Sequence, residues 1–223
     1  MPIADLIILP YYIEWGSLIY AQVRQSNIKG DSPWSIEGTG AKILTNPDAP
    51  LLLKNEAGIT LATQIGLSWT IGVKDGGAPV EDYRVTMYDP EKSEYRIIQS
   101  GILIPITSFT ATGLKAGLVY KFKVQSQNDY GYSDYSNEVL ILAAQKPSAP
   151  PAPVTSISGL NVKIKWTPST DISNGSPIQG YQIYIKEHET LNYYIDSTNC
   201  NGVTDANILL TGECLVPINI LRS

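Results

Sequence analysis

The 223-residue sequence predicts an all-β protein whose strands form sandwiches. Short runs with apolar residues at alternate positions recur along the chain and are bounded by turn residues. Tyr, which favours strands, occurs 14 times against 2 Phe, while 18 Gly and 15 Pro supply turns. Wherever a helical apolar period begins, Gly or Pro interrupts it within about a dozen residues. Together these observations favour sandwiches over a helical or mixed fold.

The expected strands follow one another through the middle of the chain. Several of them place apolar residues at every second position, which turns one face of each strand toward a core. Turn residues separate them at intervals of roughly ten residues, which is typical of a sandwich or barrel. The strands are expected at Ile65–Ile71, Val80–Tyr88, Tyr95–Gln99, Ile102–Phe109, Val119–Gln127 and Glu138–Leu142.

Four short patterns occur twice in the chain, which indicates an internal repeat. The two copies lie 97 to 101 residues apart and keep their order. The matches are NPDAP at 46–50 with KPSAP at 146–150, LSWT at 67–70 with IKWT at 164–167, GAPVEDY at 77–83 with GSPIQGY at 175–181, and VRQSN at 23–27 with VQSQN at 124–128. The last pair extends to Gly30, Ser32 and Ser35, matched by Gly131, Ser133 and Ser136.

These residues resemble the fibronectin type III domain, and the resemblance covers nearly all of the chain. Residues 46–145 carry a leading Pro-rich turn, Trp69 on the second strand, and Gly77 and Pro79 before Tyr83. The run from Leu114 to Tyr120 looks like the tyrosine corner of that family. The resemblance implies immunoglobulin-like β-sandwiches in tandem, with Trp69 between the two sheets and the Tyr120 hydroxyl tied to upstream backbone.

The resemblance divides the chain into one intact domain and one domain split between the two chain ends. Residues 46–145 are the intact domain, and residues 146–223 supply the N-terminal strands of a further one. Residues 1–45 supply C-terminal strands, with the sixth expected at Leu18–Asn27 and the seventh at Trp34–Leu44. Ile19 stands where the corner tyrosine is expected, which places that hydrogen bond in doubt.

The end of the chain repeats its beginning. Residues 216–221 match residues 1–6 with Pro, Ile and Leu in register, which places the expected division within the fifth strand of the split domain. Half a sandwich exposes unpaired backbone and an open core. We therefore expect either a fragment of a longer covalent array or a subunit that neighbouring copies complete.

Cys200 and Cys214 lie in the half that differs most from the intact copy. One interpretation is a disulfide that closes a long loop before the fifth strand, which would stabilise the fold by roughly 3 kcal/mol. It would indicate an oxidising, extracellular setting. The alternative is a pair of reduced thiols in the structure. A zinc site is not expected, because only His188 could join the two cysteines.

The composition argues against several classes of function. His188 is the single histidine and lies in a polar run, and no phosphate-binding glycine loop precedes a helix, so we expect no enzyme, metal or cofactor. A net charge of −5 argues against nucleic acid. The apolar run Leu6–Tyr12 is short and contains Pro10, so we expect no membrane insertion; a secretion signal would lie outside these residues.

Three features are candidates for binding or modification. Lys29 and Asp31 flank a loop glycine where some members of the family carry an integrin-binding Arg-Gly-Asp, although ordinary loop residues would explain them equally. Tyr130, Tyr132 and Tyr135 could grip a glycan or a protein, or could cover the side of the sandwich. Asn174 opens the sequence Asn-Gly-Ser, which is both an N-glycosylation signal and a good turn.

We therefore expect a non-catalytic, extracellular or cell-surface structural or adhesive protein. It would be a repeat unit of a rod or filament of β-sandwich domains. Its expected partners are other copies of itself or adjacent repeats of the same chain, with glycan or cell-surface protein as a further class. Two alternatives stay open: a ligand-binding ectodomain of a receptor or adhesin, and an accessory spacer of a secreted glycan hydrolase.

Overall fold

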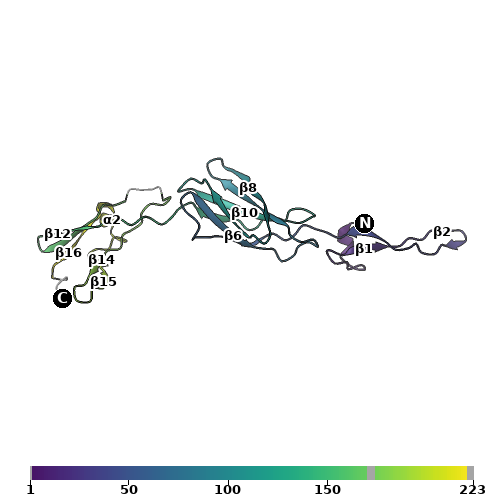
Figure 1. Ribbon diagram of the computed structural model, residues 1–223, viewed down its shortest axis with the longest axis horizontal. Helices are drawn as coiled ribbons and strands as arrows, with labels where there is room; N and C mark the ends of the chain where they lie inside the picture. The colour runs from purple at the N-terminus through teal and green to yellow at the C-terminus, as the bar shows by residue number, and fades with distance from the viewer. Residues whose placement is uncertain (1, 170–173, 220–223) are drawn as a thin grey trace. The chain divides into compact units, whose positions relative to one another are not determined.

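The computed structural model describes residues 2–169 and 174–219 (Figure 1). It divides into two compact units, one formed by residues 1–114 and 118–143 and the other by residues 115–117 and 144–223. Strands dominate both units, so the expected all-β class is confirmed. In the described part of the chain, no helix is long and apolar enough to cross a membrane.

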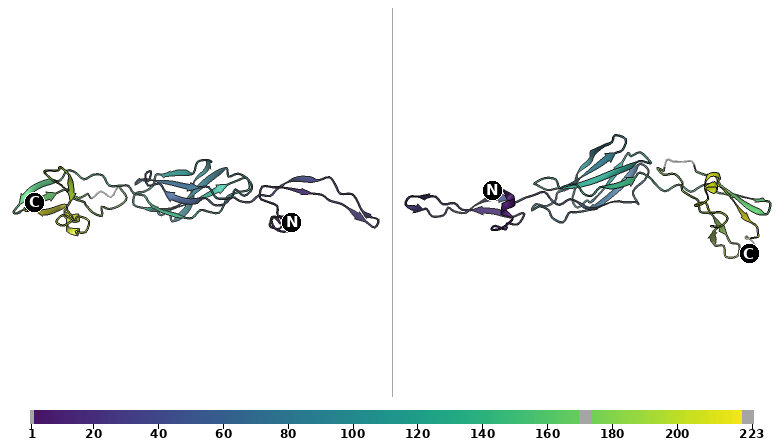
Figure 2. Two further views of the ribbon diagram at one scale, coloured as in Figure 1. Left: turned by 90° about the horizontal axis from the view of Figure 1, so that it is seen from below. Right: turned by 180° about the vertical axis from the view of Figure 1, so that it is seen from behind.

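The first unit contains a complete sandwich of two antiparallel sheets (Figures 1 and 2). One sheet has three strands in the order β5-β6-β9, and the other has four in the order β11-β10-β7-β8. The strands are β5 (Leu51–Asn55), β6 (Gln64–Thr70), β7 (Asp82–Asp89), β8 (Glu94–Leu103), β9 (Ser108–Thr112), β10 (Val119–Gln127) and β11 (Val139–Leu142).

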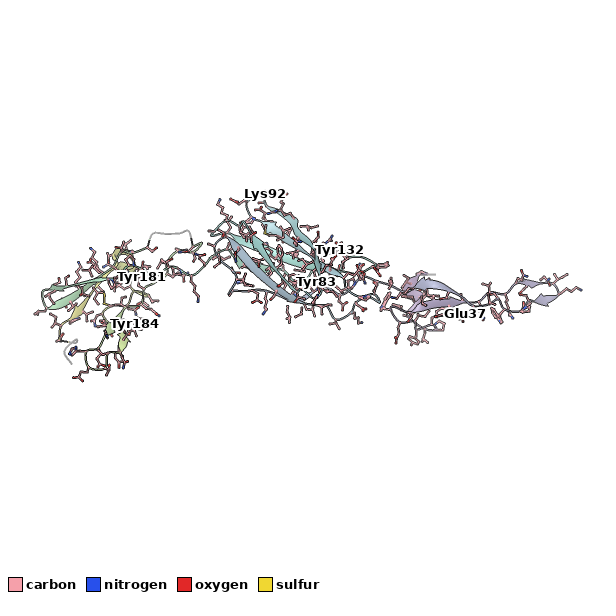
Figure 3. The ribbon with its side chains drawn as sticks, in the orientation of Figure 1. Glu37, Tyr83, Lys92, Tyr132, Tyr181 and Tyr184 are labelled. Atoms are coloured by element: carbon pink, nitrogen blue, oxygen red, sulfur yellow. A yellow bond between two sulfur atoms is a disulfide. The ribbon has the colours of Figure 1, made fainter. Side chains whose placement is uncertain are left out.

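The core of this sandwich lies between the two sheets. Trp69 on β6 and Tyr83 on β7 meet edge to face, with ring centroids 5.4 Å apart. Phe122 and Val124 on β10 are fully buried, and Lys123 between them is only partly buried. This alternation gives each strand one core face, as the apolar spacing of the sequence predicts. Figure 3 shows the Tyr83 side chain within the sandwich.

The N-terminal part of the first unit is a long hairpin, preceded by the short helix α1 (Ile3–Leu6). β1 (Leu18–Ala21) pairs with β4 (Gly38–Lys42), and β2 (Ser26–Asn27) pairs with β3 (Gly30–Asp31) nearer the tip. The chain then joins the sandwich, where the Thr45 N–H donates to the Gly76 carbonyl at 2.9 Å. Gly76 has φ +75°, and a Cβ there would lie 2.2 Å from the Thr45 oxygen, so this junction requires glycine.

The second unit contains two smaller sheets and one helix. β12 (Val154–Ser158), β13 (Asn161–Lys165) and β16 (Glu213–Pro217) form the order β12-β13-β16. β14 (Tyr184–Lys186) pairs with β15 (Tyr193–Ile195). A second core contains Trp166, directly after β13, and Ile183, directly before β14.

A short helix, α2 (Ala206–Thr211), precedes β16. The Asp205 carboxylate caps it by accepting hydrogen bonds from the N–H groups of Asn207 and Ile208. Gly212 ends it in the left-handed conformation at φ 65°.

Three strand predictions are wrong in detail. The expected strand Ile102–Phe109 is divided, because β8 ends at Leu103 and β9 begins at Ser108. Between them Ile104 donates to the Glu81 carbonyl and Ile106 donates back to the Leu103 carbonyl, so the chain turns from one sheet to the other.

The expected sixth strand, Leu18–Asn27, is also broken, since β1 ends at Ala21 and β2 begins at Ser26. The expected seventh strand, Trp34–Leu44, is limited to β4 (Gly38–Lys42). The equivalent strand of the sandwich, β10, runs without a break because β7 pairs with its other edge. Among the described residues, β1 is paired with β4 alone.

The matching ends of the chain do not share a secondary structure. Residues 216 and 217 end strand β16, whereas Ile3–Leu6 form α1. The expectation that both copies belong to a fifth strand is therefore wrong for the N-terminal copy. Met1, Ile220 and Leu221 lie outside the described residues.

Candidate interaction surfaces

Two serines fasten the N-terminal hairpin through their side chains and backbone. The Ser35 N–H donates to the Val23 carbonyl at 2.8 Å, and the Val23 N–H donates to the Ser35 Oγ at 3.1 Å. Ser32 makes the same pair of bonds with Gln25, at 2.8 and 3.1 Å. Each serine therefore donates from its backbone N–H and accepts at its Oγ, both to the backbone of the same partner residue. These bonds hold the two arms of the hairpin together between the β1–β4 and β2–β3 pairings.

The sandwich repeats this arrangement 101 residues later. Ser136 makes the reciprocal pair of bonds with Val124, at 2.8 and 3.0 Å. Ser133 does so with Ser126, at 2.9 and 3.0 Å. The hairpin of residues 16–43 thus has the local geometry of β10 and β11. The sequence match at 23–27 and 124–128 is a match of backbone bonding as well.

The hairpin is more exposed than its counterpart in the sandwich, β10 with β11. Val23 is 71% exposed, whereas Val124, the equivalent residue of β10, is fully buried. Ala21 is likewise exposed where Phe122 is fully buried. In the sandwich, β6 and β7 cover these two positions. The hairpin therefore presents a surface that a complete domain covers.

The second unit has an unpaired strand edge in its described residues. β15 pairs with one edge of β14. Among the described residues, 2–169 and 174–219, no strand pairs with the other edge. An open groove of about 360 Å³ is lined by apolar side chains on β13 and β14 and directly beside them, which include Ile164, Trp166, Ile183 and Ile185. In the sandwich, β10 lies beside β7 at the equivalent place.

The tyrosine-rich loop after β10 is partly engaged by the sandwich. The Arg84 guanidinium lies 3.6 Å from the centroid of the Tyr132 ring, so this tyrosine covers the side of the sandwich. Tyr130 is 56% exposed and Tyr135 is 47% exposed. Asn128 shapes the loop, since its Oδ1 accepts from the N–H of Tyr130. The exposed pair remains a candidate for binding.

The loop at the hairpin tip uses its charged residues differently. Asp31 forms an ion pair with Arg24 at 2.9 Å and accepts a hydrogen bond from the Ser26 hydroxyl. Arg24 also lies 4.9 Å from the centroid of the Trp34 ring. Lys29 is exposed, and its N–H donates to the Asn27 Oδ1. Asp31 is thus engaged within the hairpin.

An ionic cluster on the outer face of the four-stranded sheet was not predicted. Glu138 accepts a hydrogen bond from the Tyr95 hydroxyl and lies 3.3 Å from Lys123 Nζ and 3.8 Å from Lys121 Nζ. The hydrogen bond from Tyr95, followed by the neighbouring lysines, lowers the pKa of Glu138 below its ordinary value. The same bond raises the pKa of Tyr95. The members come from β8, from β10 and from the residue directly before β11, so linear sequence spacing does not reveal them.

Cys200 and Cys214 are joined by a disulfide in the second core. It links the loop after β15 to β16, across the segment that contains α2. Asn174 is only 6% exposed, and its side-chain oxygen accepts a hydrogen bond from the Gln145 amide at 2.9 Å. The Asn174 side chain is therefore buried and hydrogen-bonded, and glycan attachment at this residue stays a prediction.

The chain was compared with known proteins. The family model described as "Fibronectin type III domain" matches residues 54–141. "Protein sidekick" of Drosophila melanogaster is 28% identical over 195 residues, which is 80% of this chain and 8% of that protein. "Exoglucanase B" of Cellulomonas fimi is 30% identical over 155 residues, which is 66% of this chain and 13% of that protein. The chain thus spans a small part of these relatives.

Human "Fibronectin type-III domain-containing protein 3A" is 29% identical over 139 residues, covering 61% of this chain and 11% of that protein. Among solved structures, a crystal structure of titin domains has a TM-score of 0.45 at 20% identity, covering 60% of this chain and 44% of that one. The matched residues 54–141 contain the landmark Trp69, the buried Tyr83 and all strands from β6 to β10. This chain carries a fibronectin type III domain.

Proposed function

We propose that the chain is a non-catalytic structural unit of an extracellular array, in which β-sandwich domains follow one another. In this proposal residues 1–45 and 146–223 are the two parts of a split domain, and the hairpin of one copy completes the second unit of another. Fibronectin type III domains are generally non-catalytic, and the disulfide suits an oxidising compartment.

One observation carries this proposal: within its described residues the second unit has sheets of three and two strands, where the sandwich has three and four. The two strands not found among those residues are the ones whose hydrogen bonds the hairpin of residues 16–43 reproduces. An added hairpin would cover the exposed Val23 and the open groove together. Burial of apolar surface and pairing of free backbone groups would both favour association.

Sedimentation velocity of the full chain over a range of concentrations tests the proposal. We expect species at multiples of 24.3 kDa that grow with concentration. A folded monomer that keeps this mass at every concentration would contradict completion between copies.

A ligand-binding ectodomain is a second candidate, favoured by the exposure of Tyr130 and Tyr135. Exposed tyrosines are frequent in protein and glycan contacts because they combine apolar area with a hydroxyl. The likeness to Exoglucanase B supports a related role, a spacer beside a catalytic domain that acts on glycans.

Binding of the full chain to insoluble cellulose tests this candidate. Loss of binding in Tyr130→Ala and Tyr135→Ala, with binding retained in Tyr11→Ala, would favour it. Tyr11 is a suitable control because it is 51% exposed and lies outside the loop. Equal behaviour of all three variants would remove the loop from consideration.

A further inference from the structure

The register of the sandwich can be transferred to the split domain. In the sandwich β10 pairs with β7, with Lys121 opposite Tyr88 and Val124 opposite Val85. The hairpin matches β10 at an offset of 101 residues, and β14 with β15 matches β7 with β8 at an offset of 98. A hairpin added to β14 therefore places Tyr20 opposite Lys186 and Val23 opposite Ile183.

Two side-chain pairs on the outer face of the sandwich join β10 to β7. The Lys121 Nζ lies 5.3 Å from the centroid of the Tyr88 ring. The Arg84 Nε donates a 2.8 Å hydrogen bond to the Gln125 Oε1. Each pair is directly cross-strand, the position at which side chains contribute most to sheet pairing.

In the transferred register the split domain would have the same two pairs, with their members exchanged between strands. Tyr20 on the hairpin would lie opposite Lys186, with the aromatic ring and the ammonium on exchanged strands. Arg24 would lie opposite Gln182, with the guanidinium and the amide exchanged as well. Arg24 is already oriented on the hairpin by its ion pair with Asp31. The ammonium–aromatic pair and the guanidinium–amide pair would both be kept, although the residue type at each position has changed.

A third pair is kept without exchange. In the sandwich the Tyr95 hydroxyl donates to Glu138. At the same offsets, Tyr193 on β15 corresponds to Tyr95, and Glu37 before β4 corresponds to Glu138. Figure 3 shows Glu37 on the hairpin. Its carboxylate would meet the Tyr193 hydroxyl when the hairpin of one copy lies on the second unit of another.

The exchange makes the wrong combinations unfavourable. A hairpin that added to β7 of a sandwich would place Arg24 opposite Arg84. Strand β10 added to β14 would place Lys121 opposite Lys186. Like charges directly opposite one another destabilise strand pairing, and such repulsion is a common source of specificity.

We propose that these exchanged pairs select the partner: the hairpin of one copy binds the edge of β14 in a second copy, in this register, and is rejected by the sandwich domain. This inference rests on the completion proposed above and adds to it the register and the means of selection. The occupant of the groove is thus a defined segment, residues 16–43 of another copy of this chain.

A cysteine pair tests the register. Gln22 is expected opposite Tyr184, and both side chains are exposed. Full chains that carry Gln22→Cys are mixed with full chains that carry Tyr184→Cys under mild oxidation. We expect a covalent dimer on a non-reducing gel, because opposite residues of paired strands can be bridged. The control replaces Tyr184→Cys with Lys186→Cys, two residues along β14, and should give little dimer.

Charge variants test the selection. Gln182→Arg places two arginines opposite one another, and we expect the concentration for half association in sedimentation to rise about tenfold. Adding Arg24→Gln recreates the sandwich arrangement and should return that concentration to within about twofold of the original. Gln99→Arg adds the same charge at an exposed position on β8 and should have no effect.

The outcomes separate the two proposals. A covalent dimer with no effect of Gln182→Arg would leave completion standing and overturn the selection. A dimer formed only by the Lys186→Cys control would overturn the register. Absence of both association and dimer would overturn this inference together with the proposed completion.

Discussion

Trp69 is 3% exposed and meets Tyr83 at the centre of the sandwich. The Trp69→Ala change would leave a large cavity, so we expect a loss of about 3–5 kcal/mol in the free energy of unfolding of the sandwich. Hydrogen exchange of β6 and β7 peptides in the full chain measures it. Ile71→Ala is the control, because Ile71 is 50% exposed. Equal protection in the two variants would contradict a central role for Trp69.

Glu138 gives the sandwich a dependence on pH. Its folded pKa lies below the ordinary value of 4.5, chiefly through the Tyr95 hydrogen bond, so its contribution to stability is present above that value. The contribution is lost as the pH falls through the folded pKa. We expect Glu138→Gln to lower the melting temperature at neutral pH and to match the original protein in acid. Thermal unfolding across a pH series measures the difference.

The control for this titration is Glu94→Gln, because Glu94 is an exposed glutamate at the start of β8 in the same sheet. It removes a negative charge without touching the hydrogen bond between Tyr95 and Glu138, so the melting temperature at neutral pH should stay nearly unchanged. A difference for Glu138→Gln that grows on acidification would contradict the assigned role.

Single residues were predictable where the repeat or the family resemblance marked them. Trp69 and Tyr83 belong to this group, whereas the disulfide was predicted from the presence and spacing of the two cysteines. The Glu138 cluster was not predictable, because 43 residues separate Tyr95 from Glu138 and only the sheet brings them together. The role of Tyr132 was left open for the same reason, since Arg84 lies on a different strand.

At the scale of elements, the disulfide holds the loop that contains α2 against β16. Cys200→Ser with Cys214→Ser should lower the free energy of unfolding of the second unit by about 3 kcal/mol. Hydrogen exchange in β13 and β16 measures the loss. Asp205→Ala removes only the helix cap and should cost about 1 kcal/mol, confined to α2. An equal and equally broad effect of both changes would contradict the role of the disulfide.

Strands with strict alternation were predicted well, and elements without it were not. β10 was predicted with its observed limits, and β6 and β7 nearly so. β5 was missed because its residues, LLLKN, do not alternate. α2 was missed because it is only six residues long, although Asp205 and Gly212 mark its ends.

At the scale of the whole molecule, the proposed completion places the exposed Val23 at the contact between two copies. Val23→Asp would place a charge where Val124 of the sandwich is fully buried, so we expect association to be lost. Sedimentation of the full chain measures it. Ile36→Asp is the control, because Ile36 is 92% exposed and its counterpart Asn137 is also exposed. Loss of association in both variants would point to net charge as the cause.

The division of the chain into one intact and one split domain stays a prediction, although the offset of the repeat does carry over to the hydrogen bonds of Ser32 and Ser35. The proposed pairing of the hairpin with β14 could not be derived in register from periodicity alone. It needed the register of β7 with β10 and of β14 with β15, which depend on strands far apart in the sequence.

Asn128 has a consequence for mechanics. Its side-chain amide donates to the carbonyl of Thr45, where the hairpin enters the sandwich, at 2.9 Å, and to the carbonyl of Asp75 at 2.7 Å. Tension applied to the chain ahead of Thr45 would reach β10 and the loop before β7 together. The load would shear several bonds at once and would not peel β5 away first. Asn128→Ala should therefore unfold at lower pulling force in single-molecule stretching.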